Sequence, residues 1–208
     1  AFVALVDSGW TLPLPGAGAT ARRWTALADL GAAGLPGARL AEGHADAHAV
    51  LTELGGPVPG PGRRLGVWAA EPPDARVSAR RAGGGWRLAG RKAWCSGART
   101  VTDALVTAHA DDGPRLFLAD LTAGGVRADP TVWAGPGMVA SDTGDVHFDD
   151  VPAVAVGQPG AYVDRPGFWH GGIGVAAVWA GGARGVAARL RAVVASRGAD
   201  PLLAAALG

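Results

Sequence analysis

The sequence is poor in cysteine and lysine, and each scarcity excludes a class of protein. Cys95 is the only cysteine of the 208 residues, so we expect neither an internal disulfide nor a cysteine-based zinc site. This agrees with a reducing compartment, and we expect a cytoplasmic protein. Lys92 is the only lysine, and with 19 basic against 18 acidic residues the formal net charge is +1. A charge so close to neutral argues against a nucleic-acid partner.

Long apolar runs and targeting segments are also missing. The longest uncharged run, residues 166–183, is shorter and richer in glycine than a membrane span of roughly 20 apolar residues, so we expect a buried helix and no span. The opening AFVALVDSGW lacks the basic start of a signal peptide. The chain begins with Ala1, and from Asp200 only a short, marginal helix is predicted. These ends suggest a piece of a longer protein.

The hydrophobic pattern changes twice along the chain. Residues 20–56 have helical spacing, and the Pro- and Gly-rich residues 57–64 form a linker. Short apolar runs over 65–156 predict an antiparallel barrel or sandwich of about six to eight strands. A long helix follows, with an expected apolar face of Phe168, Ile173, Ala176, Trp179, Ala183, Val186 and Leu190. The prediction is an α+β fold with N-terminal helices (1–56), a β domain (57–156) and the start of a helical bundle (157–208).

Residues 85–98, GWRLAGRKAWCSGA, are rich in large aromatic surface for a stretch with several glycines. Apolar and polar residues alternate on both sides of residues 89–91, which predicts a β-hairpin with its turn there. In that hairpin Trp94 and Ser96 share one face. Taken alone, Trp94 is expected to belong to the core, because aromatic side chains on strand faces usually do.

Several motifs occur in an order that resembles the acyl-CoA dehydrogenase family. VWAAEP at 67–72 is similar to the family's V-[TS]-E-P strand, and 84–98 is similar to its G-x-x-L-x-G-x-K-x-W-[IC]-[ST]-x-G segment. WAGPGMVASDTGDVHFDDVPA at 133–153 and the helix from residue 165 resemble later family segments. The resemblance covers about residues 65–195. It implies N-terminal helices, a middle β domain and a C-terminal helical bundle.

The resemblance also implies a binding site for FAD on the middle β domain. The tryptophan that matches Trp94 lies beside the flavin ring in this family, and the hydroxyl that matches Ser96 lies near flavin N5. Cys95 lies between them in the same segment, although by itself it is expected to be a small buried apolar side chain. Ala69 and Ala70 are also expected to contact the flavin. Ala70 stands where the family often has Thr or Ser, so only backbone groups could contact the pyrimidine end of the flavin. No residue is assignable as the catalytic base, which in the family lies in later helices.

Other polar residues give weaker signals. His44 and His48 have the four-residue spacing of metal ligands and lie near Glu42, but a solvated helix surface made polar by Asp46 and Glu53 is the simpler expectation, and no metal is predicted. Glu71 and Asp74 are expected to be carboxylates of a turn or strand end. His170 faces the flavin region by the resemblance, with a buried, hydrogen-bonded histidine as the alternative. The glycines of 171–182 are expected to allow close helix packing and not to bind phosphate.

Three functional hypotheses follow from the resemblance. The first is an acyl-CoA dehydrogenase-like flavoprotein of fatty acid metabolism. It oxidises an acyl-CoA-like thioester at Cα–Cβ with hydride transfer to FAD, and passes electrons to an electron-transfer flavoprotein or another acceptor. The second is a non-catalytic family member that acts as a binding or assembly unit. The third is a flavin-dependent hydroxylase on the same fold. A homo-oligomer is expected in each case, and the substrate itself is not predicted.

Overall fold

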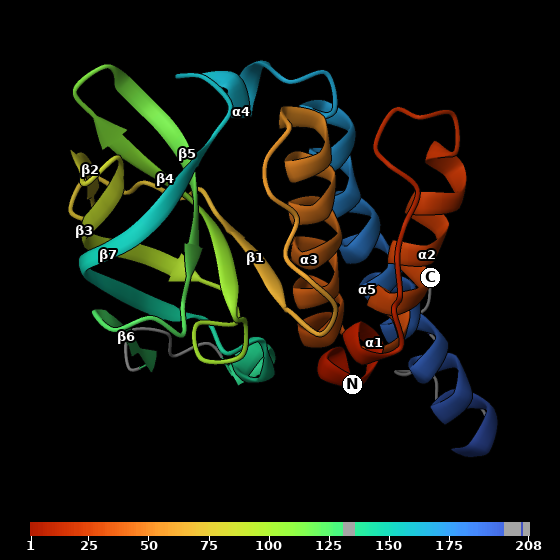
Figure 1. Cartoon of the computed structure of the whole chain (residues 1–208). Helices are drawn as coiled ribbons and strands as arrows, with labels where there is room; N and C mark the ends of the chain where they lie inside the picture. Colours follow the sequence, from red (N-terminus) through yellow and green to blue (C-terminus); the bar gives the residue numbers. More distant parts are fainter. Residues whose placement is uncertain (131–135, 198–204, 206–208) are drawn as a thin grey trace.

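The computed structural model describes residues 1–130, 136–197 and 205, and it places a β barrel beside a layer of helices (Figure 1). The helices are α1 (Phe2–Asp7), α2 (Thr20–Ala33), α3 (Leu35–Leu54), α4 (Ala161–Asp164) and α5 (Phe168–Arg197), with a 3-10 helix at Pro136–Ser141. The strands are β1 (Leu65–Trp68), β2 (Val77–Ala82), β3 (Gly85–Cys95), β4 (Asp103–Ala110), β5 (Gly113–Asp120), β6 (Val126–Asp129) and β7 (Gly144–Val156). This α+β architecture is the predicted one. The three domain boundaries stay a prediction.

The barrel is closed by five strands. The path β4-β2-β3-β7-β5 returns to β4 through the β4–β5 pairing, while β1 is added beside β4 and β6 beside β7. Most neighbours are antiparallel, as predicted, but β1 and β2 both pair with β4 in parallel. The closure encloses an apolar core that includes Leu88, Val106, Phe117, Val146 and Val151, all fully buried. A closed barrel leaves few strand edges without partners.

The predicted hairpin at 85–98 is wrong in one respect. Residues 85–95 form one continuous strand, β3, which pairs with β2 on one side and β7 on the other. The turn lies earlier, at Gly83 and Gly84, whose positive φ angles of 56° and 79° suit a two-residue hairpin. At the expected turn, Gly90 lies at an irregularity of the β3–β7 register. The break in alternation at 89–91 was therefore the mark of a β-bulge.

Helix α3 lies between the barrel and the helices α2 and α5 (Figure 1). Its Ala47, Val50 and Leu51 pack against Leu65 of β1 and Leu105 of β4. Gly55 ends the helix in the left-handed conformation, at the position where the sequence predicts a stop. Because α3 has neighbours on two sides, nearly every residue from Leu40 to Leu51 is buried. The solvated surface expected for this helix is therefore wrong.

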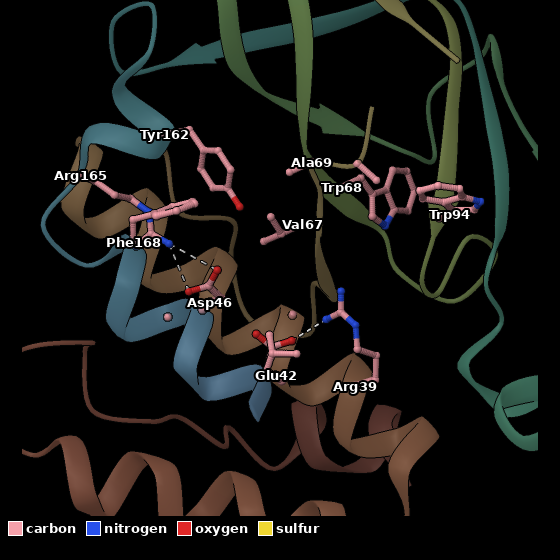
Figure 2. A pocket seen from close by; sticks show the side chains of 15 residues that line it. Arg39, Glu42, Asp46, Val67, Trp68, Ala69, Trp94, Tyr162, Arg165 and Phe168 are labelled. Carbon is pink, nitrogen blue, oxygen red and sulfur yellow. Dashed lines mark hydrogen bonds and ion pairs between the residues drawn. The ribbon is translucent and has the colours of Figure 1, made fainter. Parts of the chain in front are cut away.

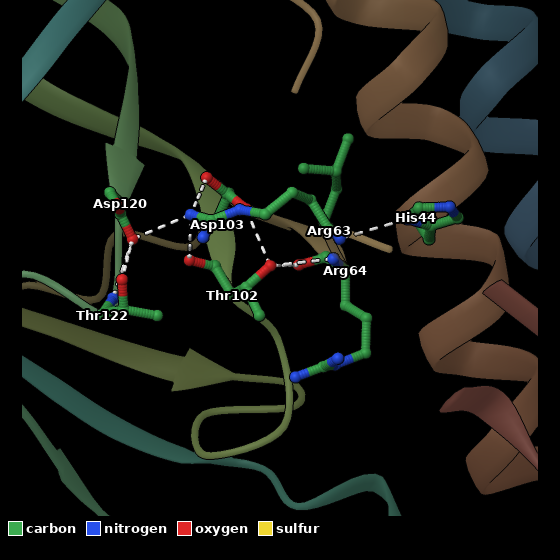
Figure 3. Close-up of polar contacts among 8 residues, drawn as sticks. His44, Arg63, Arg64, Thr102, Asp103, Asp120 and Thr122 are labelled. Carbon is green, nitrogen blue, oxygen red and sulfur yellow. Dashed lines mark hydrogen bonds and ion pairs between the residues drawn. The ribbon is translucent and has the colours of Figure 1, made fainter. Parts of the chain in front are cut away.

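The end of the linker is fixed to the barrel by polar contacts (Figure 3). The Arg63 guanidinium donates to both carboxylate oxygens of Asp103, each at 2.6 Å, and to Asp120 at 2.8 Å. The backbone amide of Arg64 donates to the Thr102 hydroxyl at 2.8 Å. One residue later, the Leu65 amide donates to Nδ1 of His44 at 3.1 Å. These bonds set the position of β1 between β4 and α3.

Glycines let α5 pack closely against α2, as the sequence predicts. Gly181 lies so close to the backbone of Ala28 that a Cβ atom would clash with its carbonyl group, and Gly31 lies equally close to Val178. The face of α5 that packs inward is therefore made of Gly171, Gly174, Val178, Gly181 and Gly182. The face predicted to be apolar and buried is instead exposed at Ile173, Trp179 and Val186. Large side chains could not fit where the helix backbones nearly touch.

Two sequence expectations fall on residues outside the described ranges. The start of the motif at 133–153 includes residues 133–135, and the short helix predicted from Asp200 falls on 200–204 and 206–208, with only residue 205 described. In the part of the chain that the structure does describe, no helix has both the length and the apolarity to cross a bilayer.

Candidate functional site

A cavity of about 270 Å³ opens where the barrel meets the helices (Figure 2). One wall is the end of β1 and the residues after it, Val67 to Ala70, together with Trp94 of β3. The opposite wall is the face of α3 that carries Arg39, Glu42, Gly43 and Asp46. Tyr162, Arg165, Phe168 and the first turns of α5 close one end. The cavity thus combines an apolar aromatic wall with a charged one.

Trp94 is exposed beside this cavity and is not part of the barrel core. Its side chain is 55% exposed, and its backbone lies in the left-handed region with φ of 57°. The buried Asp145 carboxylate accepts a hydrogen bond from the Trp94 amide at 3.3 Å and also pairs with Arg91. The expectation that Trp94 belongs to the core is therefore wrong. A left-handed tryptophan held by a buried carboxylate is the kind of strain that collects at functional sites.

The other predicted flavin contacts are divided between the cavity and its surroundings. Ala69 and Ala70 line the cavity with Trp94, as expected from the motif order. Cys95 is fully buried in the barrel core, where burial raises its pKa, so only its backbone is near the site. Ser96 lines a smaller neighbouring hollow beside Arg39 and Gly43. Its carbonyl oxygen accepts a hydrogen bond from the Trp68 indole at 3.0 Å, which fixes Trp68 against the barrel.

The loop after β1 is anchored by the chain's only lysine. Lys92 is 1% exposed, and its ammonium group donates to the Glu71 carboxylate at 3.2 Å and to the Thr107 hydroxyl at 2.7 Å. His109 lies 3.1 Å from the other oxygen of Glu71. Burial opposes ionisation of Glu71, but the hydrogen bond from Thr107 and the charge of Lys92 outweigh it and lower its pKa. Glu71 and Asp74 are loop carboxylates, as expected, and Glu71 holds Ala69 and Ala70 in place.

The charged wall on α3 is the feature that sequence reasoning missed. Glu42 and Asp46 lie one helical turn apart and are 4% and 8% exposed. Glu42 pairs with Arg39, and burial raises its pKa to about 7 against the opposing charge of Arg39. Asp46 faces Arg165, whose guanidinium lies 3.4 Å away and is also bonded to Glu53 at 2.9 Å. The partner Arg165 comes from 119 residues further along the chain, so spacing alone could not reveal the cluster.

The histidines highlighted by the sequence do not form a site. His44 is buried, accepts the Leu65 amide and contacts the ring of His48 edge-on at 4.6 Å between centroids. Among the described residues, no group of three or more His, Cys, Asp or Glu could hold a metal ion. His170 is exposed and lies next to Gly16, outside the cavity, so the interpretation as a buried histidine is wrong.

The left-handed backbone at Trp94 predicts how two substitutions there differ in stability. A left-handed backbone costs an alanine about 1 kcal/mol or more but costs glycine almost nothing. Trp94→Gly is therefore expected to be about 1 kcal/mol more stable than Trp94→Ala, the reverse of the usual order in a strand. Urea unfolding of the two variants measures the difference. Equal stabilities, or a more stable alanine variant, would contradict the left-handed geometry.

Comparison with known proteins agrees with this architecture. Residues 70–151 match the family model for the acyl-CoA dehydrogenase middle domain. No curated protein matches the chain significantly. Among solved structures, the nitrososynthase from Micromonospora carbonacea var. africana is 28% identical, with a TM-score of 0.71. The match covers 96% of this chain and 58% of the nitrososynthase.

Two other similar structures show the same fold at lower identity. KijD3, in complex with FMN and an amino-keto sugar nucleotide, is 23% identical with a TM-score of 0.74, over 96% of this chain and 57% of KijD3. The dibenzothiophene monooxygenase TdsC from Paenibacillus sp. A11-2 is 22% identical with a TM-score of 0.68, over 95% of this chain and 63% of TdsC. This chain therefore spans about three fifths of the length of these proteins. The chain therefore shares the fold of these proteins, and its residues 70–151 are similar to the middle domain of the acyl-CoA dehydrogenase family.

Proposed function

We propose that this chain is the flavin-binding part of a flavin-dependent oxidoreductase, and that the cavity between β1, Trp94 and α3 is its reaction site. The observation that carries the proposal is the exposed Trp94 beside Ala69 and Ala70 on one cavity wall. A flavin ring needs a flat apolar surface and polar atoms at its pyrimidine edge. Trp94 offers the surface, and the backbone groups of the two alanines offer the polar atoms. The residues present therefore fit a flavin.

The cofactor class is proposed as flavin, with FMN and FAD both to be tested. The resemblance implies FAD, whereas KijD3 has been crystallised with FMN. A bound flavin supplies the electron transfer, and the chain's own residues bind the substrate, orient it and exclude water. Trp94, Ala69 and Ala70 remain the proposed flavin contacts, with Ser96 nearby and Cys95 contributing only backbone.

The charged wall favours oxygenation of a polar substrate over dehydrogenation of an acyl chain. An acyl chain in the cavity would press methylene groups against Glu42, Asp46 and Arg165, and burying charges against apolar groups is costly. One of the similar structures described above is a nitrososynthase, and another is a monooxygenase. We therefore place the flavin-dependent hydroxylase hypothesis first.

Acyl-CoA dehydrogenation is the second candidate, because the family model that matches 70–151 is that of the dehydrogenase middle domain. The electron acceptor, the homo-oligomer and the cytoplasmic location stay predictions. The apolar side chains exposed on α5, Trp169, Ile173, Trp179 and Val186, support the prediction of an oligomer or of further helices.

Flavin titration tests the cofactor site. Stacking of a flat ring on an aromatic side chain contributes about 1–3 kcal/mol, so Trp94→Ala is expected to weaken FMN or FAD binding by roughly 5- to 150-fold. Because the indole is already 55% exposed, the fold should lose little stability. Trp179→Ala, an exposed tryptophan on α5 that does not line the cavity, is the matched control and should bind like the wild type. Equal flavin affinity in both variants would show that Trp94 does not contact the flavin.

The choice between the two reactions is tested with the flavin-loaded chain. Octanoyl-CoA added without oxygen is expected to leave the flavin absorbance unchanged. Bleaching of the flavin bands would establish acyl-CoA dehydrogenation instead. A chain that binds neither FMN nor FAD would contradict the proposed flavin site.

A further inference from the structure

The charged wall of the cavity is balanced in charge. Arg39 pairs with Glu42, while Arg165 pairs with Glu53 at 2.9 Å and with Asp46 at 3.4 Å. A third arginine, the buried Arg23, interacts electrostatically with Glu42 and Asp46. Its guanidinium donates a hydrogen bond to the Pro13 carbonyl at 2.9 Å. Three arginines therefore face three carboxylates. A ligand that brought a net charge into this wall would upset the balance in a poorly solvated place.

Two polar groups at the cavity are incompletely bonded. The Asp46 carboxylate accepts only long contacts from Arg165, at 3.4 and 3.5 Å. The Tyr162 hydroxyl has no hydrogen-bond partner in the part of the chain that the structure describes, although its ring packs edge-on against Phe168. Figure 2 shows this hydroxyl pointing into the space between Val67 and Asp46. Both groups can therefore bond to a molecule in the cavity.

These groups differ in what they can bond. An ionised Asp46 can only accept hydrogen bonds, whereas the Tyr162 hydroxyl can both donate and accept. Burial, with the charge of Asp46 acting in the same direction, raises the pKa of Tyr162 to about 12, so this hydroxyl keeps its proton. A group that both donates and accepts fits this pair, and a hydroxyl does so without carrying a charge.

We propose that Asp46 and Tyr162 form the substrate-recognition subsite of this cavity, and that they bind a neutral, hydroxyl-bearing ring such as a sugar or cyclic polyol. One hydroxyl donates to Asp46, and a neighbouring oxygen accepts from Tyr162. The less polar face of the ring lies toward Val67 and Trp68 on the opposite wall. This inference rests on the proposed function, in which the cavity is the substrate site.

Other ligand classes fit the wall less well. An ammonium group would bring a positive charge that no further carboxylate of the balanced wall could match. Protonation of Glu42 near neutral pH would leave the three arginines in excess and make the ammonium less favourable still. An apolar ring would leave Asp46 and Tyr162 without partners while removing water from them, which is costly for buried polar groups. The two alternatives therefore serve as competing probes in the test.

Saturation-transfer NMR on the 208-residue chain tests the subsite, with methyl β-glucoside, cyclohexylamine and methylcyclohexane as ring probes. We expect methyl β-glucoside to bind best. Tyr162→Phe is expected to weaken its binding by about 2- to 10-fold, the effect of one lost hydrogen bond. Ser78→Ala, which removes an exposed hydroxyl from β2 away from the cavity, is the control and should leave the affinity unchanged. Circular dichroism checks that both variants keep the fold.

Three results would overturn the subsite. They are stronger transfer to cyclohexylamine or methylcyclohexane than to the glucoside, no transfer to the glucoside, and equal glucoside affinity in Tyr162→Phe and the wild type. The measurement needs no flavin, so it is independent of the titrations above. A chain that binds the glucoside through Tyr162 but binds no flavin would refute the proposed function and leave a polyol-binding site.

Discussion

Gly181→Ala is expected to lower the free energy of unfolding by about 3 kcal/mol, the upper end of the usual cost of overpacking a core. The added Cβ atom would clash with the Ala28 carbonyl, which is backbone and cannot turn aside. Helices α2 and α5 would have to separate along their whole contact, and Gly31 opposite Val178 would lose its packing too. Urea unfolding followed by circular dichroism measures the loss.

Gly172→Ala on the same helix is the matched control. Nothing lies within 4 Å of a Cβ atom built at this glycine, and the residue is exposed. Alanine is a better helix former than glycine, so this change is expected to stabilise the protein by about 0.5–1 kcal/mol. The two variants therefore shift stability in opposite directions. If Gly181→Ala were neutral or stabilising, the close α2–α5 packing would be incorrect.

Glu42 is expected to make a large pH-dependent contribution to stability. Burial raises the pKa of its carboxyl group from the ordinary 4.5 to about 7 in the folded protein. The folded state therefore binds this proton more tightly than the unfolded state does. The contribution is complete below pH 4.5 and is lost as the pH rises to about 7. Over that window the loss is about 3 kcal/mol, at roughly 1.4 kcal/mol for each pH unit.

Glu42→Gln isolates this contribution, because glutamine does not titrate. The free energy of unfolding of the variant minus that of the wild type should rise by about 3 kcal/mol between pH 4.5 and pH 7.5. His44 acts in the opposite direction, since burial lowers its pKa to about 4 and its contribution is lost as the pH falls from 6.5 toward 4. That histidine is present in both proteins and cancels in the difference. Parallel stability curves for the two proteins would show that Glu42 stays ionised.

Much of the fold could be predicted from local patterns. The stop of α3 at Gly55, the linker before β1 and the short strands of the barrel follow from turn residues and hydrophobic periodicity, which act over a few residues. The turn of the hairpin was placed wrongly because a bulge near Gly90 interrupts alternation in the same way as a turn does. The position of Trp94 in the cavity wall was anticipated only through the order of the family motifs.

The buried faces of the helices could not be predicted in the same way. On α5 the apolar periodicity marked Ile173, Trp179 and Val186, yet these side chains are exposed and glycines are buried, because the helix backbones approach too closely for larger residues. On α3 the charges suggested a solvated face. Glu42 and Asp46 are buried there because Arg39 and the distant Arg165 neutralise them.

The sequence by itself determined the element types, the order of the helical and barrel parts, and the motif residues Ala69, Ala70 and Trp94, since each depends on neighbours along the chain. The tertiary structure alone decided which of these residues share a cavity with Asp46, Tyr162 and Arg165. Those contacts join α3 to residues more than a hundred positions away. Their energies depend on burial and on charge pairing across the fold, and no local pattern encodes either.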